Sequence, residues 1–289
     1  MSYRRTLPDI SPFTFGTTKV YDASDPQHIK MVRAAMDAGV WFHTSPTYGK
    51  GQKRVYEVLR RAFAEAPAKM PRCIVKIDPH RPDTLRGTVE GALSGTGMER
   101  VDIAQIITYM QPHSQEDLQP GCAIYETMCA LQDEGKVGSY VLELNTEITD
   151  DHFEIVRREM YDGYIFYYNV VQRGMKNNSL YDLLLEKGAP LLSLRTMGGG
   201  PGDMGGTPAG EEEATRHFLR DLCQRAGCDS EAEFRIRFPL SNPAMVTTIG
   251  ATCDITHLQM LIEYANPGQS LPRDVFEDIE SMHHRWCSE

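Results

Sequence analysis

Short apolar and β-branched runs alternate with amphipathic segments along most of the chain. The runs have the composition of buried strands, and the segments between them repeat apolar residues at the helical spacing. Strands are predicted at residues 13–17, 40–44, 72–77, 102–108, 139–144, 164–168, 190–194 and 246–250. Helices are predicted at residues 26–38, 52–66, 82–93, 122–133, 150–159, 180–187, 211–225 and 230–238, with a terminal helix at 272–287.

Eight strands with helices between them predict a single (β/α)8 TIM barrel, an α/β fold, rather than an open sheet. No G-x-G-x-x-G sequence follows a predicted strand, which argues against a Rossmann domain. Residues 4–10 are predicted to form an N-terminal hairpin at the bottom of the barrel, and the helix at 272–287 is an extra C-terminal helix. We expect residues 1–289 to form one domain, with the Gly/Pro-rich segment 198–210 as a βα loop on the active-site face or, alternatively, a linker.

Composition restricts the classes of partner. The chain has 289 residues with 30 Lys and Arg against 40 Asp and Glu, a net charge of -10, which argues against a nucleic-acid surface. No apolar run reaches the length of a membrane span, and the N-terminus lacks a secretion signal. Seven cysteines without metal-site spacing predict reduced thiols, a cytoplasmic location and no metal. His283 and His284 are expected on a solvated face of the terminal helix.

Several stretches resemble the signatures of the aldo-keto reductases. Residues 38–49, AGVWFHTSPTYG, are similar to A-G-x-x-x-F-D-T-A-x-x-Y-G. Residues 101–107, VDIAQII, are similar to V-D-L-x-Q-I-H, and GKV at 135–137 opens the segment that usually reads G-K-I-R-x-I-G-V-S-N. LSNP at 240–243 and TIGA at 248–251 resemble the closing L-S-N-P and I-x-G-A. The resemblance spans nearly the whole chain in order, and it implies a barrel of this family.

The resemblance also implies a catalytic tetrad of Asp, Tyr, Lys and His at a carbonyl that receives hydride from a nicotinamide. Tyr48 stands at the position of the general acid and Lys76 at that of the lysine. An ammonium group beside a phenol lowers the phenol pKa from its usual value near 10, which helps proton transfer at neutral pH. His43 stands at the Asp position and Ile107 at the His position. The carboxylate that would support the lysine and a donor to the oxyanion are therefore both replaced.

NADP or NAD is the cofactor that the resemblance implies, although the residue types that would hold it differ here. Glu143 and Leu144 stand where a Ser-Asn pair would hold the nicotinamide carboxamide, and Ile165 stands at the position of a Gln. Leu194 lies near the position of the aromatic residue that would stack on the ring.

Four residues are nevertheless candidates for binding the cofactor. Arg195 and the loop residues Gly199 and Gly200 can meet a pyrophosphate through one guanidinium and backbone amides. A mobile loop with no ligand is the alternative for this segment. Gly250, in the closing motif, is the fourth candidate.

Three functional hypotheses follow. The first is the family activity, in which an NAD(P)-linked reaction reduces or oxidises a small carbonyl or sugar-like substrate with Tyr48 as general acid/base, assisted by Lys76 and partly by His43. The second is a non-redox lyase, isomerase or epimerase in which His43, Tyr48 and Lys76 move protons at a carbon next to a carbonyl, with Glu143 as a candidate base. The third is a pseudoenzyme that keeps the barrel without turnover. We rank the family activity first because the resemblance covers almost the entire chain.

Further polar side chains are expected around the substrate. His80, Asn145 and Tyr168 follow or end predicted strands and are candidate substrate-binding residues. Several titratable groups with aromatic neighbours predict a polar carbonyl compound, sugar or hydroxy acid as substrate. Tyr48 and Lys76 are predicted to lie within hydrogen-bonding distance at the C-terminal mouth of the barrel.

Overall fold

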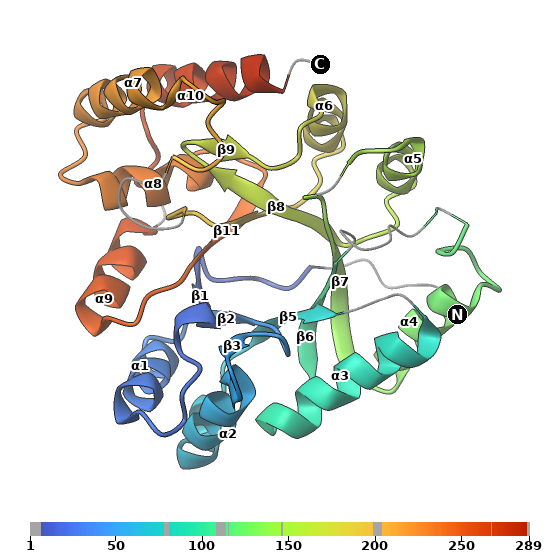
Figure 1. Cartoon of the computed structure of the whole chain (residues 1–289). Helices are drawn as coiled ribbons and strands as arrows, with labels where there is room; N and C mark the ends of the chain where they lie inside the picture. The colour runs from blue at the N-terminus through green and yellow to red at the C-terminus, as the bar shows by residue number, and fades with distance from the viewer. Residues whose placement is uncertain are drawn as a thin grey trace.

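A closed barrel of parallel strands forms the centre of the molecule, with helices around it (Figure 1). The computed structural model describes residues 7–77, 81–107, 114, 116–145, 147–198, 204–266 and 268–287. Within these ranges the barrel strands are β1 (Phe13–Gly16), β2 (Trp41–Thr44), β5 (Cys73–Ile77), β6 (Val101–Ile106), β7 (Val137–Glu143), β8 (Gly163–Asn169), β10 (Leu191–Leu194) and β11 (Met245–Gly250). They pair in that order, and β11 pairs with β1 to close the ring. The predicted (β/α)8 fold is confirmed.

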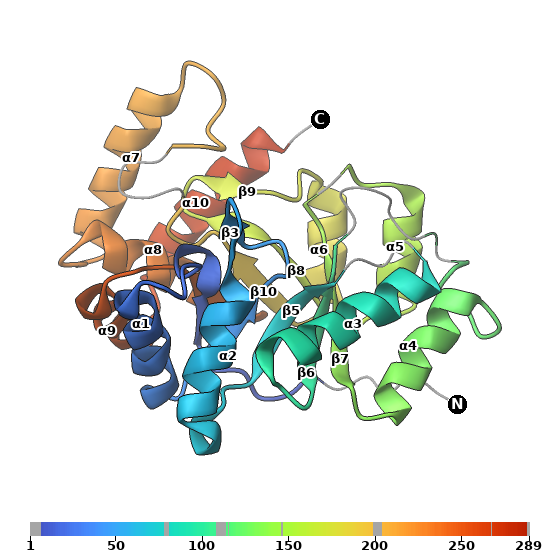
Figure 2. The same cartoon turned by 60° about the horizontal axis from the view of Figure 1, so that its bottom comes forward.

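Helices cover the outside of the barrel, and α1, α2 and α3 lie side by side along one flank (Figure 2). The helices are α1 (Pro26–Asp37), α2 (Val55–Glu65), α3 (Pro82–Thr96), α4 (Ala123–Asp133), α5 (Asp150–Arg157), α6 (Asn178–Glu186), α7 (Glu212–Arg225), α8 (Glu231–Leu240), α9 (Ile255–Tyr264) and α10 (Arg273–Trp286). Two short antiparallel pairs are added, β3 (Gly49–Lys50) with β4 (Lys53–Arg54) and β9 (Gln172–Arg173) with β8.

The strands separate two apolar clusters because successive side chains point to opposite faces. The outer cluster joins strand residues such as Phe42 and Phe166 to the helices. The second cluster contains strand side chains and Ile10 but no helix residue, and it fills the inside of the barrel. Its buried members are Ile10, Trp41, Ile74, Ile103, Val141, Ile165, Leu192, Leu194 and Ile249.

Several element boundaries differ from the sequence predictions. Helix α9 was not predicted, although Asp254 caps it by accepting a hydrogen bond from the His257 backbone N–H. Helix α6 begins at Asn178 instead of 180, because the Asn177 side chain caps its first turn. Of the predicted N-terminal hairpin, residues 4–6 lie outside the described residues. Residues 7–10 form no strand, and Ile10 enters the inner cluster instead.

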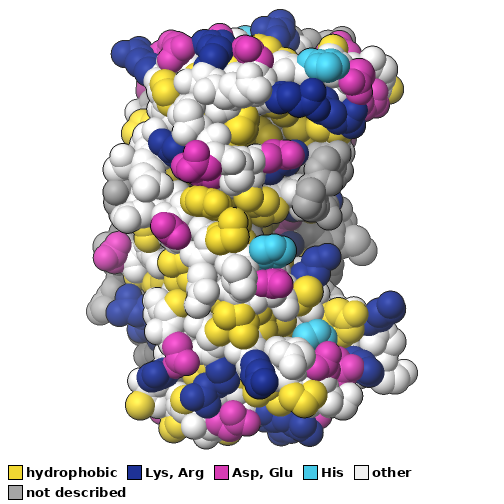
Figure 3. Space-filling view, turned by 90° about the vertical axis from the view of Figure 1, so that its left-hand side faces the viewer, with side chains coloured by type: hydrophobic (Ala, Val, Ile, Leu, Met, Phe, Trp, Pro, Cys, Tyr) yellow, Lys and Arg dark blue, Asp and Glu magenta, His cyan; other side chains and the backbone are white. Residues whose placement is uncertain are grey.

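The surface carries charges of both signs. On the face shown in Figure 3, acidic and basic side chains are interspersed with apolar ones, and no continuous basic surface is visible there. None of the helices in the described ranges is long and apolar enough to cross a membrane.

Candidate active site

Five polar or aromatic side chains form a layer above the apolar interior of the barrel. Each one comes two residues after a member of the inner cluster on the same strand, so strand alternation turns it to the same face, nearer the C-terminal end. We call these residues the polar layer: His43, Lys76, Gln105, Glu143 and Tyr167. Active sites of (β/α)8 barrels lie at this end of the strands.

Glu143 is the centre of the polar layer. Its Oε2 lies 3.4 Å from the Lys76 Nζ and accepts a hydrogen bond of 2.5 Å from the Gln105 Nε2. Its Oε1 accepts a hydrogen bond of 2.8 Å from the Asn145 Nδ2. The Glu143 and Lys76 side chains are only 2% and 13% exposed. A carboxylate this deeply buried requires a partner charge, and Lys76 supplies it.

The same hydrogen bonds determine the protonation of His43. Because the amide nitrogen of Gln105 donates to Glu143, its oxygen faces His43, and the 2.6 Å contact to the His43 Nε2 requires a proton on that nitrogen. Burial, followed by the charge on Lys76, lowers the pKa of His43 to about 3, although the bond to Gln105 opposes this shift. His43 is therefore a neutral Nε2–H imidazole near neutral pH. It does not add a second positive charge beside Lys76.

The buried neutral His43 predicts a pH-dependent stability. The unfolded chain takes up a proton at this histidine below its ordinary pKa of 6.5, whereas the folded protein does so only near 3. The contribution of neutral His43 to the stability is therefore present above pH 6.5 and is lost progressively as the pH falls towards 3. Between pH 7 and pH 5 we expect the wild-type protein to lose about 2 kcal/mol more than a His43→Asn variant, measured by urea unfolding. An equal loss in the two proteins would show that His43 is accessible to protons in the folded state.

Tyr48 lies beside this layer, in the loop after β2. Its ring centre is 6.2 Å from that of His43, and the side chain packs against the outer cluster. Since the charge of Lys76 acts on His43, the lysine and the phenol have a common neighbour. Direct hydrogen bonding between Tyr48 and Lys76 stays a prediction.

Asn145 and Tyr167 continue the wall of the mouth from Glu143. The Asn145 Oδ1 accepts a hydrogen bond of 2.7 Å from the Tyr167 backbone N–H. Burial, followed by the charge of Glu143, raises the pKa of Tyr167, and Arg195 opposes the shift. The guanidinium carbon of Arg195 lies 5.2 Å from the centre of the Tyr167 ring. Asn145 therefore lies at the candidate site, and its predicted role in substrate binding stays a prediction.

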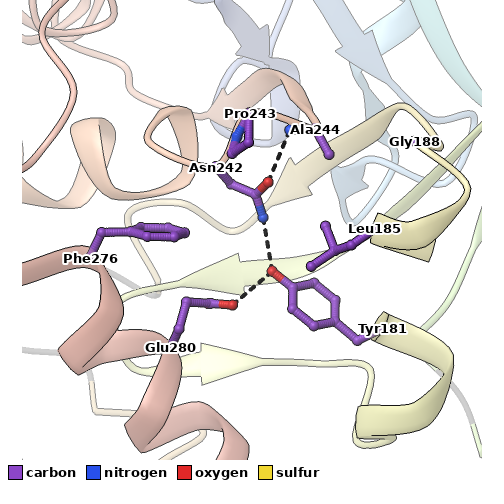
Figure 4. Close-up of a pocket in the computed structure, with 8 residues that line it drawn as sticks. All are labelled: Tyr181, Leu185, Gly188, Asn242, Pro243, Ala244, Phe276 and Glu280. Atoms are coloured by element: carbon purple, nitrogen blue, oxygen red, sulfur yellow. Dashed lines mark hydrogen bonds between the residues drawn. The ribbon is translucent and has the colours of Figure 1, made fainter. Parts of the chain in front are cut away.

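Tyr168 faces the helices outside the barrel, and the prediction that it binds the substrate is wrong. Its hydroxyl donates to the Glu280 Oε1 at 2.8 Å, and its ring stacks on Phe238 at 4.9 Å, so it faces the helix layer. Figure 4 shows the neighbouring Tyr181, whose hydroxyl donates to Glu280 and accepts from the Asn242 side chain, at the wall of a separate cavity of about 380 Å³. Residues just before β10 and β11 also line this cavity, so it lies at the N-terminal ends of strands, opposite the polar layer.

His283 belongs to the same helix layer. It is completely buried, with its ring edge-on to Tyr168 and Phe238, and the prediction that it is solvated is wrong. The apolar face of α10 covers the barrel here, and a histidine on that face is buried with it.

The remaining predicted residues are only partly placed. His80, Gly199 and Gly200 lie outside the described residues. Gly250 ends β11, where the Cβ of a larger residue would meet the Phe13 ring at 2.9 Å. This contact explains the glycine at position 250 by close packing. Cofactor binding at Gly250 stays a prediction. Ile107 is half-buried just after β6, two residues beyond Gln105.

Sequence reasoning missed Gln105 and Tyr167. Gln105 is a polar residue within an apolar strand, and it faces the same side of the strand as Ile103, two residues earlier. That signal was visible in the sequence. Ile165 stands at the position of a residue that would face the cofactor pocket. Tyr167, two residues later, faces the same side of the strand, whereas Tyr168 faces the opposite side.

The three positions expected to hold the nicotinamide carboxamide do not fit that group. Glu143 is buried, and Gln105, Asn145 and Lys76 already contact its carboxylate. Leu144 is buried in the outer cluster, and Ile165 is buried in the inner cluster. None of the three presents a free polar group to a ring in the mouth. Among the described residues, no group of three or more His, Cys, Asp or Glu side chains is arranged to hold a metal ion.

The chain is an α/β protein of the (β/α)8 class, and its buried titratable residues lie at the end of the barrel where active sites of this fold are found. Comparison with known proteins makes this more specific. The model of the Aldo/keto reductase family matches residues 12–284. The chain therefore belongs to the Aldo/keto reductase family.

Several solved structures share the fold of this chain. An aldo-keto reductase from Klebsiella pneumoniae in complex with NADPH has a TM-score of 0.71 and 16% identity, covering 95% of this chain and 92% of that chain. One from the same organism with NADP and acetate has a TM-score of 0.72, with the same identity and coverage. A putative aldo-keto reductase from Pseudomonas aeruginosa has a TM-score of 0.61 and 17% identity, covering 89% of each chain. A search of curated proteins gives no match.

Proposed function

We propose that the chain is an enzyme acting on a small polar carbonyl compound, and that Tyr48 donates a proton to the carbonyl oxygen. The buried pair of Lys76 and Glu143, 3.4 Å apart, carries this proposal. The carboxylate forms a buried ion pair with the Lys76 ammonium group. An ammonium group beside a phenol favours release of the phenol proton. Glu143 thus supplies, from another strand, the support that an Asp at position 43 would have given.

Glu143 is better explained as the partner of Lys76 than as a base. A general base must reach the proton that it removes. Glu143 is almost completely buried and already accepts hydrogen bonds from the side-chain amides of Gln105 and Asn145. The non-redox hypothesis therefore loses Glu143 as a base.

Reduction or oxidation with NADP or NAD is the activity that family membership favours. Two structures of similar fold contain NADPH or NADP. In this chain the residues at the carboxamide positions do not fit the ring, so we limit the proposed chemistry to the proton that Tyr48 transfers. The hydride-transfer step is tested by nucleotide binding.

Calorimetric titration of the purified protein with NADPH and with NADH is the direct test. Because Glu143, Leu144 and Ile165 offer no free polar group to the carboxamide, we expect either nucleotide to bind only weakly, with a Kd well above the micromolar range. Circular dichroism of the same sample confirms that the barrel is folded. Micromolar binding of either nucleotide would contradict the misfit and would favour the family's redox reaction at this mouth.

We also propose one domain over the whole chain and a cytoplasmic location. All seven cysteines are free thiols, as is usual in a reducing compartment. The family match from residue 12 to residue 284 supports a single unit.

A further inference from the structure

Arg195 presents an exposed positive charge at the mouth of the barrel. It directly follows Leu194, which pairs with Tyr167 in the register of β8 and β10. Within the described ranges no carboxylate forms an ion pair with Arg195. Lys76, the other cation of this wall, is already matched by Glu143. Among the described residues of this wall, Arg195 is therefore a cation that no carboxylate balances.

The backbone of Arg195 is held in an unusual conformation. Its φ is 55°, in the left-handed region that residues with a side chain rarely adopt. Its carbonyl oxygen accepts hydrogen bonds from the Asn169 Nδ2 at 2.9 Å and from the Gly198 N–H at 2.6 Å. Asn169 is completely buried on β8. A buried side chain of the barrel wall thus sets the direction in which the arginine leaves the strand.

The ring of Tyr167 then supports the guanidinium. Stacking on an aromatic face restricts an arginine side chain while its N–H groups keep their capacity to donate. A connected series of contacts leads from this group towards the proposed acid. It runs from Tyr167 through Asn145, Glu143 and Gln105 to His43, whose ring centre lies 6.2 Å from that of Tyr48. The cation and the proton donor therefore border the same mouth.

We propose that Arg195 binds an anionic group of the substrate, so that the substrate is a carbonyl compound carrying a carboxylate or a phosphate. This inference rests on the proposed function, because it uses the same mouth. A planar guanidinium pairs with either anion through two parallel hydrogen bonds. The net charge of -10 gives the protein no general attraction for anions, so a specific cation is needed to bind one.

Binding of matched charged and neutral carbonyl compounds tests this inference. The pairs are pyruvate with hydroxyacetone, and dihydroxyacetone phosphate with dihydroxyacetone, titrated at low ionic strength. The variant is Arg195→Asn, because asparagine tolerates the left-handed backbone. The control is Arg273→Gln, which removes a 90% exposed arginine on α10. We expect a charged compound to bind more tightly than its neutral partner, and Arg195→Asn to weaken it about tenfold or more while Arg273→Gln does not.

Other outcomes would overturn the inference. Equal affinities in wild type and Arg195→Asn would do so, as would failure of both anions to bind the wild-type protein. If Arg195→Asn loses inorganic pyrophosphate or NADPH but keeps the organic anions, the arginine serves a nucleotide instead. A Tyr48→Phe variant separates the two proposals, because it should keep anion binding. Anion binding through Arg195 without turnover of any carbonyl compound would contradict the proposed function alone.

Discussion

Replacing Glu143 with Gln is expected to lower the free energy of unfolding by about 3 kcal/mol, because it breaks a buried ion pair and leaves one partner behind. Lys76 is only 13% exposed in the folded protein, so water replaces little of the lost interaction. Glutamine keeps the size of the side chain and thus creates little cavity. Urea unfolding followed by circular dichroism measures the change.

The control for this variant is Glu134→Gln. Glu134 forms ion pairs with Arg86 and Lys136 at 2.8 Å, but its side chain is 39% exposed. Exposed pairs are screened by solvent, so this variant should change stability much less. Comparable losses in the two variants would mean that Glu143 has no special role in supporting Lys76.

Replacing Tyr48 with Phe is expected to reduce turnover by about two to four orders of magnitude, the usual contribution of a general acid. The substrate for this assay comes from a screen of small carboxylated or phosphorylated carbonyl compounds, with NADPH or NADH added in large excess as the hydride donor. The fold should be unaffected, because the ring keeps its packing against the outer cluster. Steady-state rates of wild type and variant give the result.

Tyr56→Phe is the matched control, because it makes the same chemical change nearby. The Tyr56 hydroxyl is buried without a hydrogen-bond partner on α2, and burial raises its pKa. We expect full activity in this variant. Unimpaired turnover in Tyr48→Phe would remove Tyr48 from the mechanism.

The fold could be predicted because the barrel strands are apolar enough to stand out as separate runs. Helix boundaries depended on local caps, and two of these caps were overlooked. Asn177 and Asp254 each accept a hydrogen bond from a backbone N–H in the first helical turn. The ten-residue helix α9 after Asp254 was missed entirely. Its sequence combines a recognisable cap with Leu258 and Leu261 at the helical spacing.

Only part of the candidate site was readable from the sequence. The resemblance located Tyr48, Lys76 and His43 along the chain, and it gave no distances between strands. That Glu143 of β7 reaches Lys76 of β5 depends on how the barrel closes, and the sequence contains no direct sign of it. Tyr168 was misplaced for a simpler reason: residues three apart on a strand face opposite sides, so Ile165 and Tyr168 cannot share a pocket.

The misfit at the carboxamide positions and the support of Lys76 have the same cause. A carboxylate at position 143 cannot serve a nicotinamide while it is held by Lys76, Gln105 and Asn145. Glu143, which stands where the Ser-Asn pair would contact the cofactor, is thus also the carboxylate that pairs with Lys76. Binding and acid chemistry need to be measured separately for this reason.

The ionisation of Tyr48 tests the central claim most directly. NMR of protein with ¹³C-labelled tyrosine, with Tyr48 assigned through Tyr48→Phe, gives its pKa in wild type and in Lys76→Met. With the ammonium group of Lys76 beside the phenol, the account predicts a wild-type Tyr48 pKa below the ordinary value near 10 and a clear upward shift in Lys76→Met. The same pKa in both proteins would contradict the account, because Lys76 would then have no effect on the proposed proton donor.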